Sequence, residues 1–93
     1  MLFVVIEHFK NRDPRPVRER FMERGRPLPD GVTYHASWID EPGCRCFQIM
    51  EARDEAALRS WTNRWSDLID FEIVPVVTPS EYWQRVASSA DKP

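Results

Sequence analysis

Short apolar stretches recur four times along the chain, and their length and β-branched content predict β-strands. They cover residues 1–9, 32–39, 44–51 and 70–77. The first is mainly apolar on both faces, whereas the second is half-polar, as is typical of a strand near a sheet edge. The fourth contains Pro75, which cannot donate a backbone hydrogen bond, so it is also expected at an edge.

Two segments between these strands carry apolar residues at helical spacing instead. The first begins with Asp13 and Pro14, which suit a helix start, and is expected to end at Gly25. Val17 and Phe21, four residues apart, mark its inward side. The second runs from Asp54 to about Trp65 and shares one apolar face, which we interpret as core.

A short third helix is predicted over residues 80–87, capped by Thr78 or Ser80, and residues 88–93 are expected to form a flexible tail. The preceding elements follow the order strand, helix, strand, strand, helix, strand. This order is that of the ferredoxin-like βαββαβ plan, an α+β fold with two helices on one face of a four-stranded antiparallel sheet. Residues 1–87 are expected to form this single domain.

The other face of such a sheet lacks cover, apart from the short third helix. Three of the four predicted strands nevertheless carry apolar residues on both faces. Large exposed apolar surfaces mark interfaces or ligand grooves. The pattern therefore predicts that a second copy of the chain packs against this face, sheet to sheet, as a homodimer.

Composition narrows the class of protein. The 93 residues include 30% charged side chains and have a net charge of −2, which is unlike the clearly basic domains that bind nucleic acid. The longest apolar run, Leu2 to Ile6, is too short to cross a membrane and does not fit a signal peptide. Two cysteines cannot build a disulfide framework. We expect a cytoplasmic protein with no nucleic-acid or membrane partner.

Several segments together resemble a known family: MLFVVIEHFK, RERFMERGRPLPDGVTY, SWID, CRCFQIMEA and WTNRWSDLIDFEIVPVVT. Over about residues 1–80 the chain resembles a bacterial family described as domain of unknown function 3303. That family is similar to the dimeric α/β-barrel superfamily, which includes muconolactone isomerase-like and antibiotic-biosynthesis monooxygenase-like proteins. The resemblance implies two ferredoxin-like subunits with joined sheets, and a pocket between sheet and helices or inside the barrel. It implies no particular reaction.

Glu7 is a candidate general acid or base. It shares a strand face with Phe3, Val5 and Phe9, so burial of that face would raise the pKa of its carboxyl. The alternative is a structural carboxylate paired with an arginine. His8 points to the opposite face, so it cannot act together with Glu7 in one pocket.

His35 is the second candidate base, because histidine titrates near neutral pH. The alternative is a half-exposed residue of an edge strand. Gln48 lies between Cys46 and Met50 on a central strand, and its buried amide would need a partner, either a ligand or a backbone group or water. Glu51 ends the same strand and is a further candidate ligand contact.

Tyr34 and Trp38 are predicted to share one face of the second strand and could line a pocket or pack in the core. Cys44 and Cys46 are two residues apart on a strand, too far for a relaxed disulfide, and no metal-ligand spacing occurs. We therefore expect no metal and no cofactor.

Three functions remain open. The first is a protein that binds a small, partly hydrophobic molecule through Glu7, Tyr34, Trp38, Gln48 and Glu51. The second is a small cofactor-free enzyme, isomerase-like or monooxygenase-like, with Glu7 or His35 as base. The third is a non-catalytic assembly module whose sheet serves only association.

Overall fold

The computed structural model describes the backbone of residues 1–90 and the side chains of residues 1–88. The strands are β1 (Leu2–Phe9), β2 (Thr33–Ile39), β3 (Arg45–Glu51) and β4 (Ile69–Val76). The helices are α1 (Arg15–Arg24), α2 (Glu55–Thr62) and α3 (Pro79–Ala90), with short 3-10 turns η1 (Lys10–Arg12) and η2 (Asn63–Trp65). This order confirms the predicted ferredoxin-like α+β fold.

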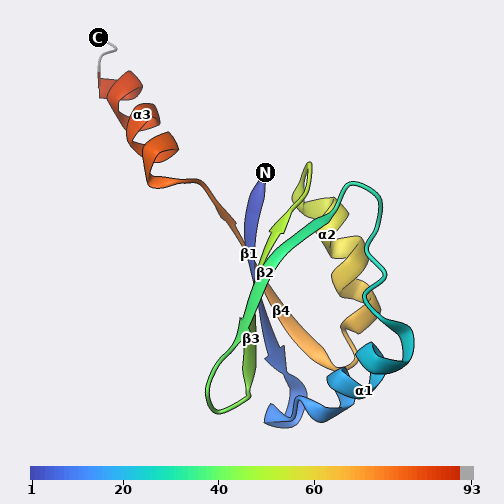
Figure 1. Cartoon of the computed structure of the whole chain (residues 1–93). Coiled ribbons are helices and arrows are strands. Elements are labelled where there is room, and N and C mark those ends of the chain that lie inside the picture. The colour runs from blue at the N-terminus through green and yellow to red at the C-terminus, as the bar shows by residue number, and fades with distance from the viewer. Residues whose placement is uncertain (91–93) are drawn as a thin grey trace.

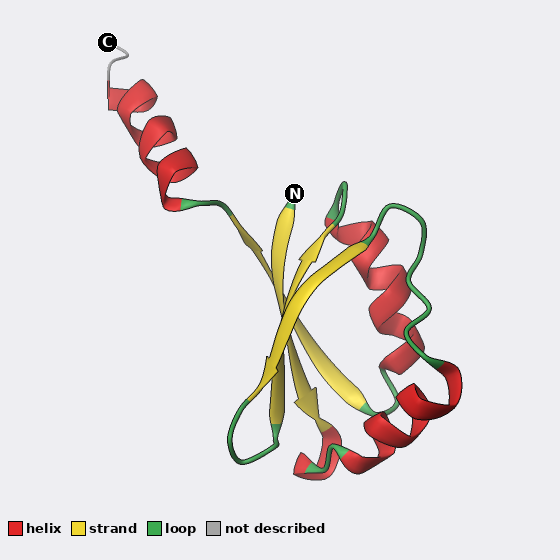
Figure 2. Ribbon diagram, viewed as in Figure 1, coloured by secondary structure: helices red, strands yellow, loops and turns green. Residues whose placement is uncertain are grey.

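One antiparallel sheet contains all four strands in the order β2-β3-β1-β4 (Figure 2). The central strands are β3 and β1. The edge strands are β2 and β4, as their polar face and Pro75 predicted. At an edge, the missing N–H of Pro75 does not interrupt a ladder between two neighbours.

Helices α1 and α2 lie on the same side of the sheet, as Figure 1 shows. We call the sheet surface beneath them the inner face and the opposite surface the outer face. Alternation along β1 places its buried residues on the inner face and its half-exposed residues on the outer face. The core between the sheet and α2 includes Phe3, Val5, Met50, Leu58, Trp61 and Ile69.

Two of the predicted helix signals, Asp54 and Gly25, act as expected, whereas the N-cap of α1 is Pro14 and not Asp13 as predicted, so this helix begins one residue later, at Arg15. The Asp54 side chain accepts a hydrogen bond from the Ala57 N–H at 2.9 Å and so caps α2. Gly25 ends α1 with a φ of 72°, a left-handed conformation that favours glycine, and its N–H donates to the Phe21 carbonyl. Phe21 itself is 40% exposed, so the inward stripe of α1 is only partly buried.

A register shift in β2 corrects the prediction that Tyr34 and Trp38 share a face. The pairing with β3 is interrupted between Tyr34 and Ala36, which adds one residue to β2. One extra residue reverses the direction of every later side chain. Tyr34 therefore lies opposite Met50 on the inner face, whereas Trp38 lies opposite Phe47 on the outer face.

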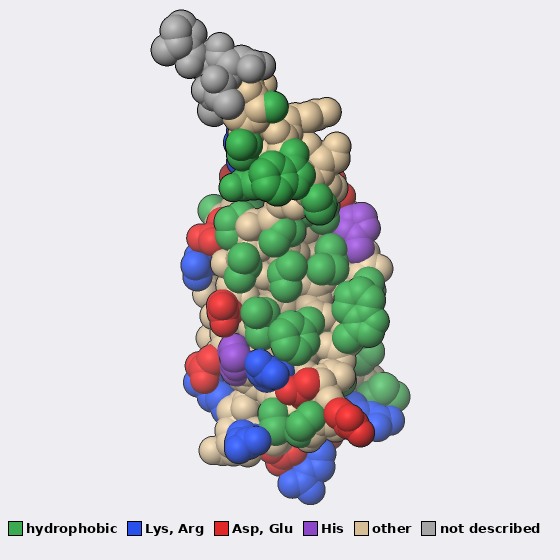
Figure 3. All heavy atoms as spheres, turned by 90° about the vertical axis from the view of Figure 1, so that its left-hand side faces the viewer, with side chains coloured by type: hydrophobic (Ala, Val, Ile, Leu, Met, Phe, Trp, Pro, Cys, Tyr) green, Lys and Arg blue, Asp and Glu red, His purple; other side chains and the backbone are tan. Residues whose placement is uncertain are grey.

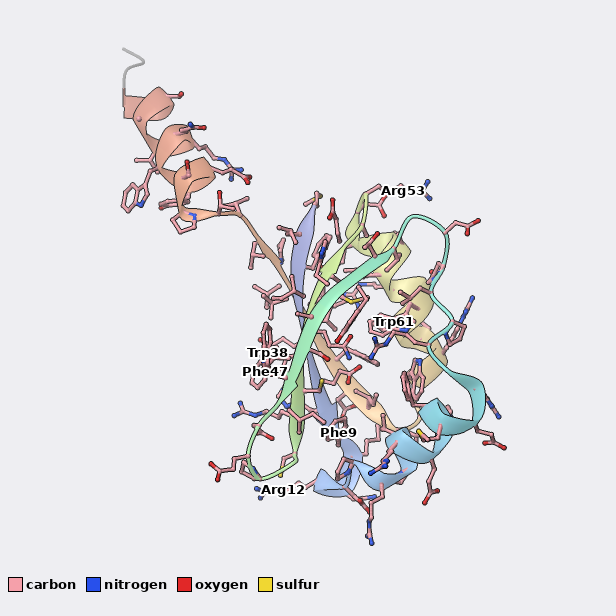
Figure 4. The ribbon with its side chains drawn as sticks, viewed as in Figure 1. Phe9, Arg12, Trp38, Phe47, Arg53 and Trp61 are labelled. Atoms are coloured by element: carbon pink, nitrogen blue, oxygen red, sulfur yellow. The ribbon has the colours of Figure 1, made fainter. Side chains whose placement is uncertain are left out.

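None of the described helices covers the outer face (Figure 1). Figure 3 shows this surface as a field of apolar side chains with charged groups at its margins. Trp38 and Phe47 project from it together, on the side away from Trp61 (Figure 4). Its apolar members are Leu2, Val4, Ile6, Ala36, Trp38, Phe47, Ile49, Val74 and Val76.

Helix α3 projects beyond the end of β4, away from α1 and α2 (Figure 1). Thr78 caps it, because its hydroxyl accepts a hydrogen bond from the Glu81 N–H at 3.1 Å. The helix continues to Ala90, past the predicted end at residue 87, so residues 88–90 of the predicted flexible tail are helical. The rest of that tail, residues 91–93, lies outside the described residues. The projecting helix explains a radius of gyration of 16.0 Å, against about 12 Å for a compact domain of this length.

Candidate functional site

A cavity of about 570 Å³ lies between the inner face, α1 and the end of α2. This volume falls within the range of small-molecule sites in proteins. Its wall is mostly apolar, with a few polar side chains on the sheet and three arginines on α1 and the loop after it. The residues that line it are Glu7, Phe9, Pro14, Arg15, Val17, Arg18, Phe21, Arg26, Ser37, Ile39, Cys46, Gln48, Trp61, Trp65 and Ile69.

Glu7 is the acidic residue of this wall. Strand β1 directs it inward between Cys46 of β3 and Phe71 of β4. Burial raises the pKa of its carboxyl to about 7, although the charge of Arg26 and hydrogen bonding with Cys46 and Gln48 act in the opposite direction. Near neutral pH both protonation states are therefore populated, so Glu7 can either donate or accept a hydrogen bond.

Two further polar residues lie beside Glu7 on β3. Gln48 is 4% exposed, and its amide nitrogen donates to the Cys46 sulfur at 3.8 Å. Among the described residues, the amide oxygen of Gln48 and the indole N–H of Trp61 have no hydrogen-bond partner. Unpaired buried polar atoms are uncommon because each costs about 1–3 kcal/mol. Gln48 is part of the cavity wall, so a donor group on a bound molecule can pair with this oxygen.

Cys46 does not have the character of a nucleophile. Burial, followed by the neighbouring charge of Glu7, raises the pKa of its thiol to about 11. The thiol is therefore protonated near neutral pH, and the thiolate is the reactive form. Cys44 and Cys46 are both free, as their spacing predicted.

Arg26 brings a positive charge to the cavity from the loop between α1 and β2. Its guanidinium lies 4.0 Å from the centre of the Tyr34 ring and 5.2 Å from that of Phe21. The Tyr34 hydroxyl in turn lies 2.6 Å from the Ser37 hydroxyl, which is part of the cavity wall. A cation over aromatic faces is held by the ring quadrupoles.

The structure brings together some of the candidate residues and separates others. Glu7 and Gln48 both line the cavity, and Tyr34 lies next to it through Arg26 and Ser37.

The remaining candidates lie elsewhere. Trp38 is on the outer face and 61% exposed. His35 is an exposed residue at the register shift of β2, and its ring nitrogen lies 2.8 Å from the Glu51 carboxylate. His8 points to the outer face, as predicted, where it lies 3.4 Å from the Glu72 carboxylate. A molecule in the cavity would therefore meet Glu7 without a histidine partner.

Sequence reasoning missed several residues of the wall. Trp61 and Trp65 were interpreted as core because of their helical spacing, and they are buried, but one side of each faces the cavity. Arg26 lies between Gly25 and Pro27, where the chain leaves the helix. Its place in this short loop is the one sequence signal that its side chain has a defined position. Ser37 had none, because only the register shift turns it inward.

Among the described residues, no group of three or more His, Cys, Asp or Glu side chains is placed to hold a metal ion. The helices in this part of the chain are also too short or too polar to cross a lipid bilayer.

Comparison with known protein families gives a match. The model of a family described as "Domain of unknown function (DUF3303)" matches residues 1–90, and this match extends through α3. Neither the curated proteins nor the solved structures include a match to the chain.

Proposed function

We propose that this chain, which belongs to the DUF3303 family, binds a small, partly hydrophobic molecule in the cavity between its sheet and helices. The observation that carries the proposal is a ligand-sized, mostly apolar cavity with a buried carboxyl and an unpaired buried amide oxygen in its wall. Sites for small molecules combine an apolar wall with a few fixed polar groups in this way. The apolar part of the ligand packs against Trp61, Trp65 and Phe9, and its polar end lies at Glu7 and Gln48.

The binding test uses thermal unfolding with a panel of small aromatic and alicyclic compounds, both neutral and anionic. A ligand that binds only the folded state stabilises it by about 2.7 kcal/mol at a hundred times its dissociation constant. Val17→Phe, which fills the cavity from α1, should abolish this effect. The matched control is Met22→Phe, on the solvent side of the same helix. A panel without any stabilising member, or equal stabilisation of Val17→Phe, contradicts the proposal.

A second candidate is catalysis without a cofactor, and the pKa of Glu7 favours it. A general base works best when its pKa is near the working pH. The Glu7 carboxylate would take a proton from the bound molecule and return it at another position, which amounts to an isomerisation. Glu7→Gln should then bind the compound and lose its turnover at least about a hundredfold. Unchanged turnover excludes Glu7 as the base.

We further propose that two copies associate through the outer face. Each chain has one apolar sheet surface and one projecting helix with exposed Tyr82, Trp83 and Val86. Figure 3 shows apolar side chains of the projecting part on the same side of the molecule as the sheet surface. A two-fold arrangement buries both surfaces of both chains at once, and such closed pairs are the commonest oligomers. The interface would thus include α3 as well as the sheet.

Sedimentation velocity tests the association. We expect the wild type to sediment as a dimer and Trp38→Glu as a monomer, because the new charge would lie in the interface. Met22→Glu, at a similarly exposed position on α1, is the control and should remain dimeric. A monomeric wild type would contradict the homodimer. A dimer without ligand binding would instead favour a pure assembly module.

The location of the protein is also a proposal. The two free cysteines fit a reducing compartment, where thiols stay unpaired. We therefore place the protein in the cytoplasm, and fractionation of intact cells would test this.

A further inference from the structure

The cavity wall contains more basic than acidic side chains. One acid, Glu7, faces three arginines, Arg15, Arg18 and Arg26. Arg15 is neutralised by Asp13, since two of its nitrogens lie 2.9 Å from the two carboxylate oxygens. Arg18 and Arg26 form no ion pair with the side chains of residues 1–88. The cavity therefore has an excess of positive charge.

Arg26 is the better placed of these two cations. Arg18 is exposed on α1, whereas Arg26 is partly buried. The rings of Tyr34 and Phe21 contact the guanidinium of Arg26. Aromatic rings bind a guanidinium through its flat faces, which leaves the N–H groups around its edge free to donate. Two parallel N–H groups match the two oxygens of a carboxylate.

We infer that the ligand of the cavity is an organic monoanion, a carboxylate on an aromatic or alicyclic body, and that Arg26 binds the carboxylate. The inference rests on the proposed binding function and adds the chemical class of the ligand. A carboxylate is favoured over a phosphate because a single partly buried guanidinium balances one negative charge. The aromatic wall formed by Phe9, Trp61 and Trp65 suits a flat apolar body.

Glu7 makes the binding of such an anion depend on pH. The charged or titratable groups around Glu7 are Arg26 from the loop, Arg15 and Arg18 from α1 and Cys46 from β3. The arginines stay charged and the thiol stays neutral near neutral pH, so only Glu7 changes charge there. Above a pH of about 7 its carboxylate repels the ligand. Affinity for the anion should therefore fall as the pH rises from about 6 to about 8.

The test compares acids with their amides by calorimetry on the full chain. The pairs are 2-naphthoate with 2-naphthamide and cyclohexanecarboxylate with its amide. Each pair has nearly the same shape but differs in charge. We expect the wild type to bind each acid at least about tenfold more tightly than its amide near pH 6. Glu7→Gln should keep this preference and lose its decline with rising pH.

Variants of Arg26 identify the partner of the carboxylate. Arg26→Gln should weaken acid binding at least about tenfold and amide binding about twofold or less, with Arg26→Lys in between. Arg24→Gln is the matched control, because Arg24, the last residue of α1, is exposed and lies outside the cavity wall only two residues before Arg26. The circular dichroism spectra of all three variants are first compared with that of the wild type. Arg26→Lys serves as the test if Arg26→Gln does not fold.

The outcomes separate the inference from the proposed function. Equal affinity for acids and amides overturns the anion inference while the cavity remains a binding site. An acid preference that survives in Arg26→Gln overturns the role of Arg26. Tighter binding of 2-naphthyl phosphate than of 2-naphthoate overturns the choice of a carboxylate. Failure of all acids and amides to bind contradicts the proposed function itself, and the inference with it.

Discussion

The two faces of the sheet differ in what happens to their polar residues. On the inner face, Glu7 and Gln48 are buried in the wall of a cavity, and the Gln48 oxygen has no partner among the described residues. On the outer face, the histidines at the margins each lie beside a carboxylate, His8 at Glu72 and His35 at Glu51. The same strands supply both sets of residues, because their side chains point alternately to the two faces.

This contrast suggests a different role for each face of the sheet. A polar group that folding buries without a partner destabilises the protein unless something else binds it. A half-exposed pair needs nothing more, because water solvates what the pair leaves open. The inner face is therefore the one suited to a ligand, and the outer face, with its uncovered apolar surface, is suited to a second copy of the chain.

The largest difference is expected between two tryptophans, one on each side of the sheet. Trp61 is 2% exposed in the core, so Trp61→Ala should lower the free energy of unfolding by about 3–5 kcal/mol. Trp38→Ala should change the unfolding of the monomer by less than about 1 kcal/mol, because the side chain is exposed there. Denaturant titration at low protein concentration measures both. Equal losses would show that the faces do not differ in packing.

The next difference concerns pH. The folded state holds the proton of Glu7 up to about pH 7, against 4.5 for an ordinary glutamate. Because the folded state binds more protons within this window, the free energy of unfolding falls as pH rises through it, and Glu7 contributes no further change above about 7. The full effect is about 3 kcal/mol.

Glu7→Gln should remove this slope, and Glu72→Gln on the outer face is the matched control, expected to retain it. Urea unfolding at intervals between about pH 4.5 and 8 gives the profile. A wild-type profile that is flat or rising through the window would mean that Glu7 is not buried as described.

A smaller effect is expected from Gln48. Gln48→Leu removes the unpaired amide from the inner face, so it should raise the free energy of unfolding by about 1 kcal/mol and weaken ligand binding. Thermal unfolding with and without ligand measures both effects in one series. Loss of stability in the ligand-free variant would show that the amide is paired in solution.

The smallest effect is expected at the margin of the outer face. His35→Ala breaks the contact with Glu51, and half-exposed pairs of this kind contribute about 0–1 kcal/mol. Turnover or ligand affinity, if present, should stay unchanged, because the sheet separates His35 from the cavity. A large loss of either would return His35 to the list of functional residues.

Local pattern was enough to predict much of this arrangement. The neighbours Phe3, Val5 and Phe9 determined that Glu7 points inward, because side chains alternate strictly along an uninterrupted strand. Pro75 and the half-polar second strand placed both edges of the sheet.

The remaining features depend on contacts that no local pattern encodes. The register shift between Tyr34 and Ala36 is one extra residue, and it turns Ser37 inward and Trp38 outward without any glycine or proline to signal it. Arg26 reaches the cavity because Tyr34 and Phe21, from different elements, meet its side chain. Spacing along the sequence cannot reveal such a three-way contact.

The most direct test of both faces is native mass spectrometry of gently purified protein. A ligand on the inner face and a second copy on the outer face predict the mass of two chains together with a retained small molecule. Val17→Phe should keep the two-chain mass and lose the small molecule, whereas Trp38→Glu should do the reverse. A wild type that is detected as a single chain with no added mass would contradict both the dimer and the bound ligand.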